Sequence, residues 1–219
     1  MEFHLLIYNI QELIYAHNDA DQAAKAIQFG NIRRPQPYYY GMLGEHVDYE
    51  KLGDILIQGG PVYLTQWSPE QIQLAGVGRV TGQALDPRHE RFTFAKTIQL
   101  QPTSITPEGD NLALDLLWAI EQPVEDDLTA FVHLYGPGCE LLSQADGYPI
   151  AGLAPFWLWS AGQTLEDNRT LPLPPDNDIE QFSIGIGLYN PATGERLPAF
   201  DHNGNRQAND VILFPLTGG

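Results

Sequence analysis

Residues 111–120 read NLALDLLWAI and residues 182–189 read FSIGIGLY, and both segments alternate apolar with small or polar side chains. A period of two residues is typical of a strand with one buried face. From about Gly82 onward, turn signals such as GPGCE, NPATGE and DHNGN separate short apolar segments. Many short strands with this punctuation predict an antiparallel β-sandwich, of jelly-roll or immunoglobulin-like type, over residues 82–219.

Residues 1–81 have a different pattern. FHLLIYNI (3–10) and PVYLTQW (61–67) are short apolar runs that predict strands, and segments 18–30 and 47–60 combine N-cap candidates with helix formers. The order strand, helix, helix, strand predicts a small α/β subdomain over residues 1–81. The whole chain is therefore expected to be mainly β with a smaller α/β N-terminal part.

The charge of the chain narrows the choice of partners. The formal net charge is −17, from 28 acidic and 11 basic residues, and no basic stripe interrupts the sequence. Such a surface repels phosphate backbones, so we expect no nucleic acid partner and no attachment to anionic membranes by charge.

The sequence contains no targeting or spanning segment of the usual kinds. No apolar run approaches the ~20 residues of a membrane helix, and the N-terminus lacks the basic region and cleavage site of a signal peptide. We therefore expect no direct membrane insertion and a cytoplasmic location. If the chain was cut from a membrane protein, the expectation becomes an extracytoplasmic location.

Motifs for catalysis or for cofactors are not evident. The sequence has no G-x-S-x-G, H-E-x-x-H, P-loop or G-x-G-x-x-G motif, and Cys139 is its one cysteine. Segment 201–205, DHNGN, spaces Asp and Asn like a calcium loop, but its glycine and its twelfth position do not fit that motif. Because Asn-Gly favours a hairpin turn, we expect a turn, with no tightly bound calcium or zinc and no cofactor.

Two sets of side chains are candidates for catalysis. His133 alternates with Phe131 and Tyr135 on one strand and precedes Cys139, but no basic residue nearby in sequence would activate the thiol. We therefore expect a structural histidine. Glu166 and Asp167 are adjacent on a predicted strand, so they point to opposite faces and cannot act on one bond together. No catalytic residue is predicted.

The segment PFWLWS, residues 155–160, places three aromatic rings among chain-breaking residues. Flat rings near forked donors and acceptors are the mixture that binds sugars. The candidate ligand-binding residues are Tyr148, Trp157, Trp159, Asn168 and Arg169. Alternatively the rings close the sandwich, and we favour this because burying a large aromatic side chain contributes about 2–3 kcal/mol. We predict that Trp157 or Trp159 is largely buried, that Tyr148 is more exposed, and, for an extended segment, that both indoles share one face.

Several expected core and turn residues form a pattern that is similar to that of a known protein family. The pattern includes Trp159, Gly162 and Asp167, then Leu171-Pro172-Leu173-Pro174, Gly187-Leu188-Tyr189 and the turn 191–194; segment 112–134 also fits. Residues 90–215 resemble the C-terminal extracytoplasmic β-sandwich region of bacterial dolichyl-phosphate-mannose–protein mannosyltransferase-like membrane glycosyltransferases. In such enzymes the catalytic carboxylates lie in loops between early membrane helices, so the resemblance transfers no catalytic residue to this chain.

Three functions follow from these observations. The first is a non-catalytic accessory domain that binds glycan or packs against a membrane glycosyltransferase core. The second is a soluble enzyme, a glycan-active hydrolase or transferase, with its site between the two halves. The third is a purely structural or interaction domain. An exposed aromatic face would favour glycan binding, whereas converging His, Asp and Arg side chains in a deep cleft would favour the enzyme.

Overall fold

The computed structural model describes residues 5–8, 12–16, 49–57, 59, 62–67, 72–175 and 179–216. The chain divides into two compact units, Met1–Thr81 and Gly82–Gly219. Antiparallel strand is the main secondary structure of the described residues, as the alternation of apolar residues predicts. In the described residues, no helix is both long and apolar enough to cross a membrane.

The first unit contains an antiparallel sheet in the order β1-β2-β3-β4. Its elements are β1 (Leu5–Tyr8), β2 (Glu12–Ala16), helix α2 (Tyr49–Leu56), β3 (Val62–Trp67) and β4 (Ile72–Thr81). Strands β1 and β3 fall within the predicted strands, and α2 falls within the predicted helix at 47–60. The buried side chains of α2, Leu52 and Leu56, are one turn apart on one face of the helix. The helix predicted over 18–30 lies outside the described residues.

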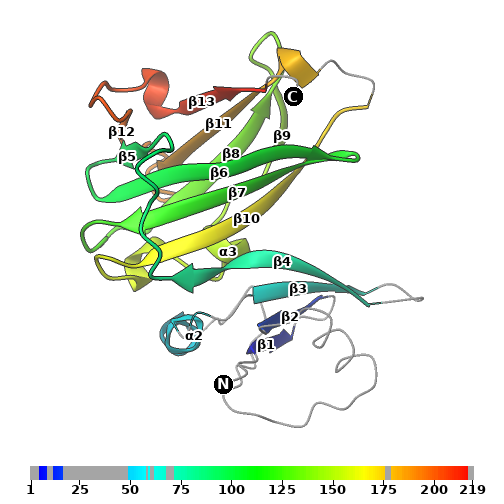
Figure 1. The fold of residues 1–219 in the computed structure, drawn as a ribbon, viewed down its shortest axis with the longest axis vertical. Coiled ribbons are helices and arrows are strands. Elements are labelled where there is room, and N and C mark those ends of the chain that lie inside the picture. The colour runs from blue at the N-terminus through cyan, green and yellow to red at the C-terminus, as the bar shows by residue number, and fades with distance from the viewer. Residues whose placement is uncertain are drawn as a thin grey trace. The chain divides into compact units, whose positions relative to one another are not determined.

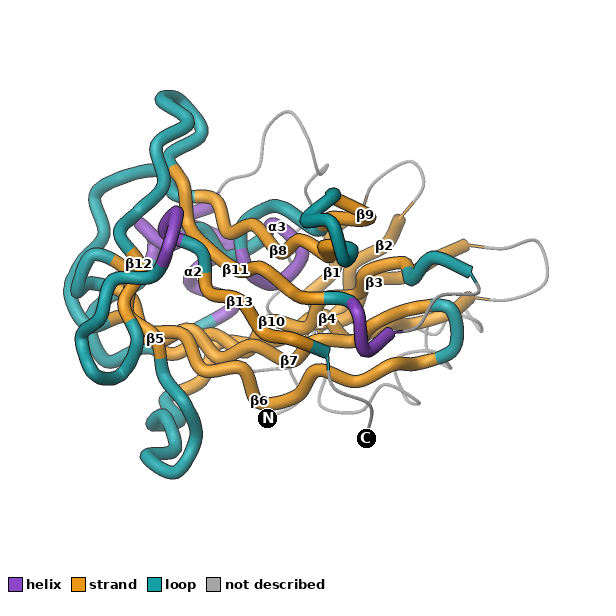
Figure 2. Tube along the Cα trace, turned by 90° about the horizontal axis from the view of Figure 1, so that it is seen from above, coloured by secondary structure: helices purple, strands orange, loops and turns teal. Residues whose placement is uncertain are grey.

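The second unit is the predicted β-sandwich, whose two sheets form separate layers (Figures 1 and 2). The large sheet has the order β10-β7-β6-β5-β12, and the small sheet has the order β13-β11-β8-β9. The large sheet contains β5 (Phe92–Phe94), β6 (Ile98–Glu108), β7 (Asn111–Ile120), β10 (Thr164–Pro172) and β12 (Ala199–Phe200). The small sheet contains β8 (Thr129–Tyr135), β9 (Leu141–Gln144), β11 (Ser183–Tyr189) and β13 (Ile212–Pro215).

The core lies between the inner faces of these sheets. Inward side chains of both sheets are buried, including the fully buried Leu112, Leu114 and Trp118 of β7 and Ile184, Ile186 and Leu188 of β11. Phe92 of the large sheet meets Phe214 of the small sheet edge to face, with ring centroids 5.3 Å apart. The alternation quoted above therefore marks the inward side chains of both layers, and the sandwich prediction is confirmed.

The glycines of FSIGIGLY leave space on the outer face of the small sheet. A Cβ at Gly185 would lie 2.6 Å from Cε2 of Tyr135, and one at Gly187 would overlap the ring of Phe131. Phe131 and Tyr135 lie on the neighbouring strand β8, so their rings cover the two glycines. The alternation in β11 is therefore isoleucine or leucine inward and space for aromatic rings outward.

Short helical turns connect the strands. They are α3 (Pro149–Gly152) and the 3₁₀ turns η1 (Phe156–Leu158), η2 (Ile179–Gln181) and η3 (Ala208–Asp210). The first two lie in the connection from β9 to β10, which carries the aromatic segment.

Candidate functional site

Arg169 and Asp167 form an ion pair inside the sandwich. Arg169 Nε donates to Asp167 Oδ2 at 2.8 Å, with side chains only 7% and 0% exposed. The remaining guanidinium nitrogens donate to backbone carbonyls of Ala145 at 2.6 Å, Gly147 at 3.1 Å and Ala130 at 3.3 Å. Contact of Arg169 with a ligand would require these bonds to break. In this structure the Arg169 side chain links β10 to β8 and to the segment after β9.

The Asp167 carboxylate also holds the turn that precedes the aromatic segment. Its Oδ1 accepts the Ile150 backbone N–H at 2.9 Å, and its Oδ2 accepts Trp118 Nε1–H at 3.1 Å. Ile150 and Ala151 adopt left-handed φ values of 56° and 52°. A β-branched residue rarely has this conformation, which costs roughly 1–3 kcal/mol, so a buried carboxylate with three charged or polar donors stabilises a strained turn.

The aromatic segment is a 3₁₀ turn and not an extended strand. In a 3₁₀ helix residues three apart share a face, and Phe156 and Trp159 are buried at 0% and 3% exposure. Trp157 is 38% exposed. The prediction that at least one of the two indoles is largely buried is confirmed. A common face for both indoles is expected only for an extended segment, and this segment instead forms a turn with a period of three residues.

Trp159 has a buried polar atom. Its Nε1–H has no hydrogen-bond partner among the described residues. A buried donor without an acceptor costs about 1–3 kcal/mol. The ring therefore contributes through its apolar surface, at the cost of this donor.

The two other predicted ligand residues lie outside this core. Tyr148 is half-buried and donates its hydroxyl to Asp127 Oδ1 at 2.6 Å. Asn168 donates its amide to Asp115 across the neighbouring strand β7. Because Asn168 and Arg169 are consecutive in β10, their side chains leave opposite faces of the sheet. The structure therefore does not bring these two residues to one surface.

His133 is part of a hydrogen-bonded chain on the outer face of the small sheet. Its Nε2 lies 3.0 Å from Asp146 Oδ1, and its Nδ1 lies 3.0 Å from the Tyr135 hydroxyl. Cys139 is exposed and is not part of this chain. The alternation of Phe131, His133 and Tyr135 on one face is confirmed by their ring contacts. The arrangement links β8 to the segment after β9, which agrees with the structural histidine expected.

Glu166 and Asp167 are separated as predicted. Asp167 is 1% exposed on the inner face of β10 and Glu166 is half-buried on the outer face. Among the residues that the structure describes, no group of three His, Cys, Asp or Glu side chains is placed to hold a metal ion.

The outer face of the large sheet carries a groove that sequence analysis did not predict. One part of it is a hollow of about 580 Å³ lined by Arg91, Thr93, Lys96, Gln99, Phe200, Asp201, His202 and Gly204. Because Arg91 and Lys96 line it, this hollow is called the basic groove. A second hollow of about 370 Å³ is lined by the chain segment 82–85 together with Arg91, Gln99, Ala119, Ile120, Glu121, Gly162 and Thr164. Both are lined by Arg91 and Gln99, so they meet at these side chains.

The floor shared by the two hollows is a single row across the sheet. Register pairs Phe200 with Thr93, Thr93 with Gln99, Gln99 with Ala119 and Ala119 with Thr164. The strand neighbours of these residues are buried inward, so alternation directs the row outward. With strands about 4.8 Å apart, the row is about 19 Å long from β12 to β10.

A strained hairpin brings Lys96 to the basic groove. Ala95 and Lys96 join β5 to β6 with left-handed φ values of 46° and 62°. Two residues with positive φ match the twist of a hairpin, and Gly or Asn is the usual choice there. The Ala95 N–H donates to the carbonyl of Pro198 at 2.9 Å, which fixes the hairpin beside the chain that leads into β12.

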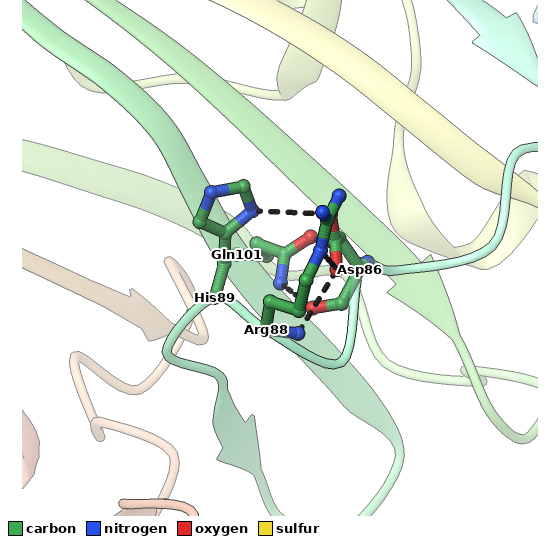
Figure 3. Close-up of polar contacts among 4 residues, drawn as sticks. All are labelled: Asp86, Arg88, His89 and Gln101. Carbon is green, nitrogen blue, oxygen red and sulfur yellow. Dashed lines mark hydrogen bonds and ion pairs between the residues drawn. The ribbon is translucent and has the colours of Figure 1, made fainter.

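Gln101 anchors the loop before β5 to the sheet (Figure 3). The same loop ends at Arg91. Gln101 is 1% exposed; its Oε1 accepts the Asp86 N–H at 2.9 Å, and its Nε2 donates to the Asp86 carbonyl at 2.8 Å. The Asp86 carboxylate accepts hydrogen bonds from the guanidinium of Arg88 and then from its backbone N–H, and these bonds lower the pKa of Asp86 to about 2. The loop is thus held at one residue by a reciprocal pair of hydrogen bonds.

The DHNGN segment is a turn at the rim of the basic groove. Asp201 Oδ1 accepts the backbone N–H groups of Asn203 and Asn205, both at 2.9 Å, and Oδ2 accepts from Asn205 Nδ2 at 3.0 Å. These bonds, that from the Asn205 side chain first, lower the pKa of Asp201. The turn expected from Asn-Gly is confirmed, and Gly204 occupies its left-handed position with φ 80°.

Sequence alternation alone could have found part of this groove. In FTFAKTIQLQ, a period of two puts Thr93 and Gln99 outward once Phe92 and Phe94 are inward. The contribution of Phe200 and His202 depends on the pairing of β12 with β5, about a hundred residues away in sequence. No pattern within either segment of the sequence predicts that these two strands pair.

Comparison with known proteins gives little. No family model matches the sequence, and no curated protein matches it. The crystal structure of Bacteroides uniformis beta-glucuronidase matches 64% of this chain and 18% of its own chain, with 13% identity and a TM-score of 0.32. At this TM-score the likeness carries no weight for function.

Proposed function

We propose that this chain is a non-catalytic accessory domain that binds glycan, and that it acts beside a membrane glycosyltransferase core. The observation that carries the proposal is the row from Phe200 to Thr164, which forms the floor of two adjoining hollows on one sheet face. Their volumes, about 580 and 370 Å³, are in the roughly 300–1,000 Å³ range of small-molecule sites.

The chemistry of the floor suits a sugar chain. Phe200 supplies a ring for an apolar sugar face, and Thr93 and Gln99 supply a hydroxyl and an amide for sugar hydroxyls. Thr164 closes the far end of the floor, where its side chain is buried and its hydroxyl donates to the Gln83 carbonyl at 2.9 Å. Ala119 keeps the middle of the floor low. A floor of about 19 Å accommodates more than one sugar unit, so we expect an oligosaccharide and not a monosaccharide to bind.

The link to a glycosyltransferase rests on the resemblance of residues 90–215 to the C-terminal sandwich of the mannosyltransferase-like enzymes. Several residues of that pattern are structural in this chain, among them Trp159 and Asp167, which are buried. The resemblance therefore supports a shared sandwich. In this proposal the domain holds glycan on the extracytoplasmic side, and catalysis belongs to a separate membrane core.

Filling the floor tests the proposal. Mannotriose, cellotriose and trigalacturonate would be titrated into the isotopically labelled 219-residue chain while backbone amide shifts are followed. We expect at least one trisaccharide to shift Thr93, Gln99 and Ala119. Ala119→Phe, which blocks the middle of the floor, should abolish these shifts.

Ala113→Phe is the matched control, because Ala113 is on the same face of β7 and lines neither hollow. It should leave the shifts intact. If no trisaccharide binds, the proposed function is wrong. If binding survives Ala119→Phe but is lost in Trp157→Ala, the site is the exposed indole of the aromatic segment and not the groove.

A further inference from the structure

The basic side chains of the sandwich divide into two groups. Arg88, Arg169 and Arg206 pair with Asp86, Asp167 and Asp210. Arg196 stacks on the Phe131 ring, 4.9 Å from its centroid, and donates to the Asn209 carbonyl. Arg91 and Lys96 differ from these four arginines, because within the described part of this unit neither side chain forms an ion pair or a hydrogen bond. Both side chains line the basic groove.

This placement is unusual for so acidic a chain. With 28 acidic residues and 11 basic ones, a cation on this surface has many possible carboxylate partners, and Arg88, Arg169 and Arg206 each have one. Two cations facing one hollow instead keep a local positive potential available to a ligand. The backbone holds each of these two cations in place. Arg91 lies in the loop that Gln101 anchors, and Lys96 lies in the strained hairpin between β5 and β6.

We infer that the basic groove selects an acidic sugar, with Arg91 and Lys96 binding the carboxylate of a uronic acid unit while Phe200 contacts its ring. The inference rests on the proposed function and adds the class of ligand. A guanidinium presents a planar fork that matches a carboxylate, and an ammonium adds a point charge.

One carboxylate, that of Asp201, also lines the basic groove. Its oxygens accept three hydrogen bonds from Asn203 and Asn205 within the turn. These donors direct its charge into the turn. Arg91 and Lys96 therefore outnumber the acidic groups of this lining by one.

The charge of the whole chain limits the size of the acidic ligand. A net charge of −17 repels long polyanions. At about 0.1 M salt, charges more than about 10 Å away are largely screened, so the two nearby cations decide the binding of a short ligand. We therefore expect a short oligosaccharide with few carboxylates, and we expect poor binding of densely charged polymers.

The test compares trigalacturonate with its methyl ester, which keeps the rings and neutralises the carboxylates. Dissociation constants would be measured by calorimetry for wild type, Arg91→Gln, Lys96→Gln and Arg88→Gln. The last variant is the matched control, because Arg88 is in the same loop, lines neither hollow and loses the same charge. Thermal midpoints would verify that each variant is folded.

We expect wild type to prefer the acid over the ester by about tenfold or more, and Arg91→Gln and Lys96→Gln each to weaken acid binding by about tenfold. The affinity of these two variants for the ester should be unchanged. Arg88→Gln should change neither the affinity for the acid nor the affinity for the ester. Equal affinity for acid and ester would overturn the inference and leave glycan binding intact. An equal loss in Arg88→Gln would overturn the assignment to the basic groove. If neither trisaccharide binds, both the inference and its glycan-binding basis fail.

Discussion

Arg169 and Arg91 belong to opposite faces of one sheet, and they differ in every respect that decides a role. Arg169 is buried, and its nitrogens donate to one carboxylate and three backbone carbonyls. Arg91 lies beside two hollows, and the described residues give it no acidic partner. Arg169 is a candidate from the sequence because it follows the aromatic segment 155–160, but the buried environment of this arginine depends on contacts with distant segments.

The comparison separates Arg169, whose acceptors all lie within the protein, from Arg91, for which we propose a ligand carboxylate as acceptor. Removing Arg169 leaves a carboxylate buried without its counter-ion, whereas removing Arg91 leaves only a surface with less charge. The two faces of the sheet should therefore respond oppositely to mutation. Inner-face changes should affect stability, and outer-face changes should affect binding.

The largest effect is expected from Arg169→Met. Breaking one side of a buried ion pair costs about 3–5 kcal/mol, because Asp167 stays buried at 1% exposure. Urea unfolding of wild type and variant measures the difference in free energy of unfolding. Arg91→Met is the matched substitution on the outer face and should change stability by no more than about 0.5 kcal/mol. Equal effects in the two variants would show that the division between faces is wrong.

Trp159→Ala should have the next largest effect. Removing a buried tryptophan costs roughly 3–5 kcal/mol, and we expect the lower end, about 3 kcal/mol, because the variant also removes an indole N–H that has no partner among the described residues. Trp157→Ala, two residues away and 38% exposed, should cost about 1 kcal/mol or less. The two midpoints in urea give the comparison, and a larger loss for Trp157→Ala would contradict the packing of the 3₁₀ turn.

Features that depend on residues close together in the sequence were largely predicted, and features that depend on residues far apart in the sequence were not. Alternation in NLALDLLWAI is local, so it identified β7 and its inward residues correctly. The conformation of the aromatic segment was not predicted, because its apolar pattern does not show the 3₁₀ turn that follows Pro155 and has a period of three residues. The groove depends on β12 beside β5 and on Gln101 beside Asp86. These contacts join distant segments, and a single sequence contains no local sign of them.

Gln101→Leu tests whether the loop that carries Arg91 depends on its anchor, Gln101, for stability and for binding. The substitution keeps the volume but leaves the Asp86 N–H and carbonyl without their recorded partner, at a cost of about 1–3 kcal/mol. Because the same loop carries Arg91, binding of trigalacturonate should weaken as well. Gln99→Leu, on the same strand and face, should lower binding while changing stability by about 0.5 kcal/mol or less. An unchanged free energy of unfolding in Gln101→Leu would show that the loop is held by other contacts.

The smallest effect concerns Asp86 and appears only at acid pH. Its pKa is lowered from 3.8 to about 2, first by the side-chain hydrogen bond from Arg88 and then by the Arg88 backbone N–H. A depressed carboxyl pKa stabilises the folded state fully above the unfolded value, and this contribution is lost as pH falls from about 4 to 2. Asp86→Asn should therefore lower the thermal midpoint slightly at pH 6, and the gap to wild type should narrow through that window. A gap that stays constant down to pH 2 would mean that the charge of Asp86 does not stabilise the folded state.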